Sequence, residues 1–321
     1  MALKVSTETD ESLVIPKKKK NFWKTMKKQK ILYFMSIPVV IYVFIFNYLP
    51  VWGWTMAFQN FRPGRAFFEQ EWVGFAHFIE LFNDPHFFLV LRNTLAMSVL
   101  LLIAGFTIPI IFAVLLNELR DSIFKRSVQT ISYLPHFVSW VVVAGIVTKV
   151  LSTDGGIVNE LLMGLNLIDN PIQFMAKGEW FWYILTASDV WKQMGWNSII
   201  FLAAMAGVDP QLYEAARVDG AGRFRRIWHI TLPGIRPTIL VILILSIGNL
   251  ISIGFERQLL LGNSMVREYS EVLELYALNY GIGMGRYSYG TAISIFNSLV
   301  SIFLLLVANG VFKRYSNTSV M

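Results

Sequence analysis

The stretch from Asp209 to Pro233, DPQLYEAARVDGAGRFRRIWHITLP, carries the pattern on which the fold assignment depends. Asp209 is suited to cap a helix that has Pro210 in its first turn. Gly220 and Gly222 are suited to end this helix after about three turns. The first half of the stretch therefore predicts a short polar helix.

The second half predicts another short helix. Phe224, Ile227 and Trp228 fall on one face at helical spacing, Pro233 is expected to stop the helix, and Pro237 to open the apolar helix that follows. The whole stretch is thus a helical hairpin. On chemistry alone it is either a connector between two apolar segments or a docking element, because the first helix carries little side-chain bulk.

The apolar segments around the hairpin are long enough to cross a bilayer. The chain is 55% hydrophobic and 15% charged, whereas soluble domains carry about 25% charged residues. Runs of about 20 apolar residues predict six transmembrane helices in an all-α polytopic membrane protein. These helices are expected at about 31–58, 85–117, 127–150, 180–208, 236–256 and 287–312, with a hairpin at 209–235.

The segment 180–208 is the exception, because it contains Asp189 and Lys192. The two charges lie three residues apart on one helical face, so we expect them to neutralise each other. Pro135 is the expected flexing point of the segment 127–150. Residues 74–82 predict a short surface helix, and Asp84 is expected to cap the span that follows it.

The distribution of basic residues predicts the orientation. The tail, hairpin and connections on one side hold 19 Lys and Arg in 78 residues, against 8 in 95 on the other side. The positive-inside rule places both termini in the cytoplasm. The basic N-terminal tail 1–30, with Lys17 to Lys20, is expected to touch anionic lipid. Residues 316–321 are expected to form a C-terminal tail. Because basic residues concentrate in the N-terminal tail beside an apolar segment, the net charge of +7 indicates a lipid bilayer and no nucleic acid as partner.

The chain offers no chemistry of its own. It has no cysteine, no Gly-rich phosphate loop ending in Gly-Lys-Ser or Gly-Lys-Thr, and its four histidines have no metal-ligand spacing. We therefore assign no catalytic residue, no metal site and no cofactor to this chain.

The hairpin resembles the signature loop of permease subunits of bacterial ATP-binding-cassette importers. The matching pattern is Glu-Ala-Ala-x-x-Asp-Gly-Ala at 214–221, then Ile-x-Leu-Pro at 230–233 and Pro237. In that family the loop is the coupling helix, which docks on the ATPase subunit. The resemblance implies coupling roles for Glu214, Ala215, Ala216, Asp219, Gly220, Ala221, Gly222, Leu232 and Pro233.

Other stretches are similar to the polysaccharide-type permeases of the carbohydrate-uptake branch. They include Phe46 to Pro50, Trp72 to Phe75, Tyr133 to Trp140, and Trp191 to Trp196. The resemblance implies a type I importer-like permease domain over 31–315 in the inner membrane. It also implies a second permease in a heterodimer, two ATPase subunits that bind ATP and Mg, a solute-binding protein outside, and an oligosaccharide substrate.

The candidates for the substrate pathway are polar or aromatic residues near the predicted spans, namely Asp189, Trp191, Lys192, Trp196, Asn197, Asn249 and Glu256. Each also has a structural interpretation: an ion pair or solvation at the interface, interfacial tryptophans, or helix packing. The outer segments carry twelve acidic and eight basic residues, so they form no funnel for an anionic sugar. Local arginines at 62, 65, 257 and 286 still leave uronate oligosaccharides open.

Two other classes of function place different demands on the sequence. A self-sufficient secondary transporter or channel requires an ion-coupling site in the membrane, and the spans offer only Asp189 and Lys192. An integral membrane enzyme requires a catalytic constellation, and the sequence contains no such motif.

Overall fold

The computed structural model describes residues 29–316, so most of the predicted N-terminal tail and residues 317–321 lie outside the described residues. The chain forms two compact units, 1–53 and 54–321. In the first unit, helix α2 (Lys30–Val43) continues into the π-helical η1 (Phe44–Tyr48). Every residue of α2 is exposed, as expected for an apolar helix surrounded by lipid. The 3₁₀ helix η2 (Leu49–Phe58) leads into the second unit.

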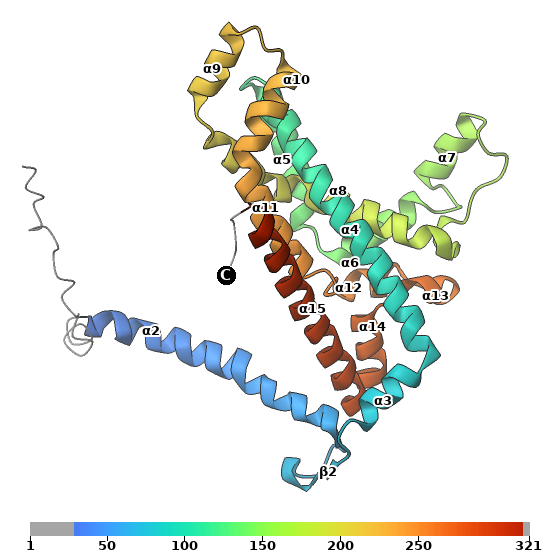
Figure 1. Cartoon of the computed structure of the whole chain (residues 1–321). Helices are drawn as coiled ribbons and strands as arrows, with labels where there is room; N and C mark the ends of the chain where they lie inside the picture. Colours follow the sequence, from blue (N-terminus) through green and yellow to red (C-terminus); the bar gives the residue numbers. More distant parts are fainter. Residues whose placement is uncertain (1–28, 317–321) are drawn as a thin grey trace, which may run out of the picture. The chain divides into compact units, whose positions relative to one another are not determined.

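The second unit is built around four long helices, α4 (Pro85–Glu118), α8 (Gly178–Ala206), α11 (Leu232–Gly248) and α15 (Tyr287–Ser316). Ala113, Phe201 and Ile235 pack α4, α8 and α11 into one apolar core. Figure 1 shows α9 and α10 beyond one end of these helices and α3 at the other.

Shorter elements complete the second unit. They are β1 (Gln59–Asn60), η3 (Phe67–Glu69), β2 (Glu71–Trp72), α3 (Ala76–Asn83), α5 (Ile123–Tyr133), η4 (Leu134–Phe137), α6 (Trp140–Val150), α7 (Ile157–Gly164), η5 (Phe174–Ala176), α9 (Pro210–Val218), α10 (Arg223–Arg226), η6 (Ile227–Thr231), α12 (Glu256–Leu261), η7 (Ser264–Val266), α13 (Arg267–Ser270), α14 (Leu273–Leu278) and η8 (Asn279–Gly283). The two strands pair antiparallel, with Gln59 opposite Trp72. The short helix predicted within 74–82 is confirmed as α3, and its position on the membrane surface stays a prediction. The Asp84 side chain caps α4 by accepting from the His86 amide at 2.9 Å.

Within residues 29–316, four helices are long and apolar enough to cross a membrane: 30–58, 85–118, 223–248 and 287–311. The segment predicted as one span at 127–150 is instead two helices with a bend of 107° between 123–137 and 140–150. The bent pair gives a fifth candidate. Pro135 lies in η4 at this break, as expected from its lack of a backbone donor. The predicted span at 180–208 forms the continuous helix α8, but its charges leave it short of the apolar character of the others.

The helix after the hairpin also differs from the prediction. Pro233 was expected to stop the second helix of the hairpin, but one helix runs from Arg223 through η6 into α11. This helix ends at Gly248, not near residue 256. The π-helical turn η6 ends at Thr231, two residues before Pro233. The wider turn changes the hydrogen-bond register where proline lacks an amide donor, so the helix continues.

A hydrogen-bonded acid joins the start of α4 to the segment 267–279. Glu271 is 1% exposed and lies 2.9 Å from both His86 Nε2 and Asn279 Nδ2, with Arg267 Nε at 3.3 Å. Burial alone would raise the pKa of Glu271, but hydrogen bonds from Asn279, His86 and Arg267 hold the pKa below its ordinary value of 4.5.

The lowered pKa gives stability a pH dependence at this cluster. The ionised Glu271 stabilises the fold above pH 4.5, and this stability is lost as the pH falls through the lower folded-state pKa. We expect Glu271→Gln to lower the free energy of unfolding at pH 7 by about 2 kcal/mol and to flatten the loss below pH 4.5. Thermal unfolding of the parent protein and of Glu271→Gln, from pH 7 to below pH 4.5, measures this difference in stability. If the stability of the two proteins fell in parallel as the pH was lowered, the stabilising role of ionised Glu271 would be contradicted.

Candidate functional site

A polar cavity of about 210 Å³ lies among α4, α8, α11 and the segment that follows α11. Its polar lining residues come from four elements and are Ser98, Asp189, Asn197, Ser246, Asn249, Ser252 and Arg257. Three of the seven predicted pathway residues, Asp189, Asn197 and Asn249, are thus brought together at one site. A polar cavity among apolar helices is where a hydrophilic substrate has partners inside a membrane.

The charge in this cavity is an ion pair between Asp189 and Arg257. The Arg257 guanidinium donates to Asp189 Oδ1 and to the Ile253 carbonyl, and the two side chains are 15% and 17% exposed. The prediction that Asp189 pairs with Lys192 is therefore wrong. Side-chain spacing on one helix brought the two residues to one face, but a guanidinium from α12 offers the shorter contact.

Lys192 has a different role, in the break between η4 and α6. It is 5% exposed, and its ammonium donates to the His136 carbonyl at 2.6 Å and the Pro135 carbonyl at 3.4 Å. A break in a helix leaves carbonyls without their usual helical partners, and Lys192 supplies a donor to the His136 carbonyl; the Pro135 carbonyl also accepts from the Val138 amide at 3.2 Å. Gly195 allows α8 to approach α5 closely, because a Cβ at residue 195 would lie 2.1 Å from the Ser132 carbonyl oxygen.

The two tryptophans among the pathway candidates, Trp191 and Trp196, lie elsewhere. Trp196 stacks on His136 with ring centroids 4.3 Å apart and an interplanar angle of 1°, so one of its faces is covered. Trp191 lines a separate apolar cavity with Ile146 and Val150. Glu256 is exposed at the start of α12 and does not line the polar cavity.

Arg257 is the residue of the polar cavity that the sequence indicated least clearly, because it was only one of four arginines named in the outer segments. Its partner lies 68 residues away, so no local pattern connects them. The only signal was the buried carboxylate at Asp189, which requires a cation.

The first half of the hairpin has the predicted local structure. The Asp209 side chain caps α9 by accepting from the Gln211 amide at 2.9 Å, and Gly220 ends the turn with a φ of 75°. The Ala221 amide donates to the Ala216 carbonyl at 2.8 Å, which closes the helix end. These contacts fix the direction in which the hairpin leaves α8.

The outward face of α9 consists of exposed residues. Glu214, Ala215 and Val218 are exposed on one side of the helix, with Asp219 exposed at its C-cap. Beyond the hairpin, Leu232 packs against the core of α4, α8 and α11, and Pro233 follows it in α11. An exposed helix thus connects directly to the packed long helices.

Comparisons with known proteins give the chain's relatives. Residues 105–317 match the model of a family described as binding-protein-dependent transport system inner membrane component. The chain is 45% identical to Protein LplB of Bacillus subtilis over 90% of its own length and 91% of the relative. It is 43% identical to the polygalacturonan/rhamnogalacturonan transport system permease protein YteP of Bacillus subtilis, over 94% of each chain.

A solved structure is similar in fold as well. A chain of a bacterial ABC transporter involved in the import of the acidic polysaccharide alginate superposes with a TM-score of 0.84 at 40% identity. The match covers 92% of this chain and 99% of the other.

Proposed function

Because the chain belongs to the binding-protein-dependent inner membrane components, the permease subunits of ABC importers, we propose that it conducts uronate-containing oligosaccharides through the polar cavity. The chain is a multi-pass inner membrane permease for a carbohydrate, not itself an ATPase. It acts with a solute-binding protein and other ABC transporter subunits.

The uronate substrate rests on one observation above the others. Two of the relatives described above are named for acidic polysaccharides: YteP for polygalacturonan and rhamnogalacturonan, and the structural relative for alginate. Within this chain, Arg257 supplies a guanidinium to the polar cavity, and guanidinium groups bind carboxylates with two parallel hydrogen bonds. Asp189 holds Arg257 until a substrate carboxylate competes for it.

The proposed assembly has a second permease in a heterodimer and two ATPase subunits that bind ATP and Mg. The exposed face of α9, with Glu214 and Ala215, faces the ATPase, and Ala216, Asp219, Gly220, Ala221, Gly222, Leu232 and Pro233 carry its movement into α11. Continuous helix from Arg223 to Gly248 supports this role, because a displaced hairpin moves that helix as one body.

The proposed topology has six crossings, with α8 as the crossing that carries charge, and both termini in the cytoplasm. The excess of basic residues around the hairpin supports this orientation. Single cysteines at Gly222 and Gly64, introduced into this cysteine-free chain, test it. We expect an impermeant maleimide to label Gly64→Cys from outside and Gly222→Cys only after permeabilisation. The reverse pattern would reject the orientation.

Reconstitution tests the function. The chain is assembled with its native partners in proteoliposomes containing ATP, and uptake of oligogalacturonate is compared with that of a neutral oligosaccharide of equal length. We expect ATP-dependent uptake that favours the uronate, and no ATP hydrolysis or accumulation by the lone chain. Uptake by the lone chain driven by an ion gradient would favour a secondary transporter. Equal uptake of both sugars would reject the uronate assignment.

A further inference from the structure

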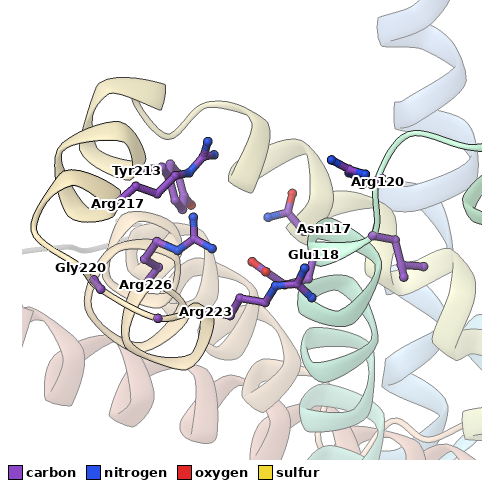
Figure 2. A pocket seen from close by; sticks show the side chains of 11 residues that line it. Asn117, Glu118, Arg120, Tyr213, Arg217, Gly220, Arg223 and Arg226 are labelled. Atoms are coloured by element: carbon purple, nitrogen blue, oxygen red, sulfur yellow. The ribbon is translucent and has the colours of Figure 1, made fainter.

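A basic pocket of about 770 Å³, which we call the hairpin pocket, lies between the hairpin and the end of α4. Its charged lining residues are Glu118, Arg120, Arg217, Arg223 and Arg226. Figure 2 shows Arg217, Arg223 and Arg226 on the hairpin side, with Asn117, Glu118 and Arg120 across from them. The pocket therefore has four positive charges against one negative charge.

These arginines lack partners of their own. None of the four forms an ion pair within the part of the chain that the structure describes, 29–316. The Nε of Arg226 is buried and has no hydrogen-bond partner there. Four guanidinium groups around one pocket repel one another, and an anion between them would offset this repulsion, so the pocket favours an anion.

The position of the pocket indicates which anion. Two membrane-span candidates, Pro85–Glu118 and Arg223–Gly248, end at its rim. These helices have 34 and 26 residues, more than the about 20 that cross a bilayer core, so their ends at the pocket lie outside the core, on the side of the lipid headgroups. Phe224 and Trp228 are 89% and 70% exposed on the same helical segment, and aromatic side chains concentrate at this interface.

The pocket also leaves free the outward face of α9, which is proposed to face the ATPase. Tyr213, Arg217 and Gly220 line it at helical spacing, whereas Glu214 and Val218 lie on the outward face. The Tyr213 hydroxyl lies 3.0 Å from Thr231 Oγ1, which holds this inner face against η6. An ATPase on the outward face and an anion in the pocket are compatible.

We propose that the hairpin pocket binds the phosphate headgroup of an anionic phospholipid. The phosphodiester oxygens accept hydrogen bonds from Arg223 and Arg226, and the acyl chains lie against Phe224 and Trp228. The site is separate from the polar cavity, so it does not depend on the identity of the transported sugar.

The test uses the full chain in nanodiscs of phosphatidylcholine with and without phosphatidylglycerol. Native mass spectrometry counts retained phosphatidylglycerol, and a fluorescent analogue gives the affinity. We expect Arg226→Gln to weaken binding about fivefold and Arg223→Gln/Arg226→Gln on the order of tenfold or more. The matched control is Arg225→Gln, because Arg225 is exposed on α10 and does not line the pocket.

Three outcomes would overturn the proposal. The first is equal retention of phosphatidylglycerol by the double variant and Arg225→Gln. The second is displacement of the lipid by millimolar inorganic phosphate, which would make the ligand a free anion. The third is loss of ATPase co-purification in the double variant with lipid binding unchanged, which would make the pocket a protein docking surface. An unchanged helical circular dichroism spectrum shows that the variants are folded.

Discussion

Replacing Arg257 by glutamine is expected to destabilise the protein by about 3–5 kcal/mol, because it leaves the buried Asp189 carboxylate without its cation. The carboxylate is 15% exposed and lies in a cavity bounded by apolar helices. The variant also removes the guanidinium from its position 5.7 Å from the centre of the Trp140 ring. Thermal unfolding in detergent measures the change in stability, and uptake in proteoliposomes measures its consequence.

Asp189→Asn/Arg257→Gln separates structure from transport. Two neutral amides remove the unpaired charge, so we expect most of the stability to return. If the guanidinium contacts substrate, uronate uptake stays low in the stable double variant. Arg65→Gln is the control for the loss of a positive charge, since Arg65 is exposed near the two-stranded sheet. An Arg257→Gln variant as stable as the parent would contradict the ion-pair assignment.

Replacing Gly220 by valine is expected to lower uptake per ATP hydrolysed, or assembly with the ATPase, on the order of tenfold. Gly220 has a φ of 75°, and a Cβ added there meets open space, so the whole effect comes from backbone strain. Strain of this kind costs about 1–3 kcal/mol, which redirects the end of α9. ATPase co-purification, hydrolysis and uptake are measured in one preparation.

Gly285→Val is the matched control. Gly285 has a φ of 70°, and a Cβ there also meets open space, but the residue lies outside the hairpin. Gly285→Val therefore introduces the same kind of backbone strain as Gly220→Val, but outside the hairpin. Glu214→Lys adds a test of charge, because Glu214 is exposed and its replacement leaves the helix intact. If Gly220→Val and Glu214→Lys both matched the parent in assembly and uptake, the hairpin would be only a connector.

The sequence predicted the features that depend on neighbouring residues. Asp209 and Asp84 cap their helices and Gly220 ends α9, because each acts on amides or carbonyls within a few residues. The hairpin pattern also indicated the family. Pro135 was expected to be a flexing point of one span for the same local reason, but the break into two helices with a bend of 107° was not expected.

Features that depend on distant partners were not predictable. The pairing of Asp189 with Arg257 and the capping of the His136 carbonyl by Lys192 each join different helices. Pro233 was misjudged because its effect depends on the π-helical turn before it, which has no sequence signal of its own. The six crossings stay a prediction, because charges within α8 obscure its apolar character.

Asp189 and Lys192 of α8 find their partners at different times during synthesis. The carbonyl that Lys192 contacts lies 56 residues before it, so this acceptor has already emerged when α8 is made. The arginine that Asp189 requires lies 68 residues after it, and ribosomes add roughly 5–20 residues per second. For several seconds, therefore, the newly made helix holds a carboxylate whose counter-ion does not yet exist. The carboxylate must stay hydrated or protonated over that interval, and α8 can settle fully among its neighbours only after α12 has been translated.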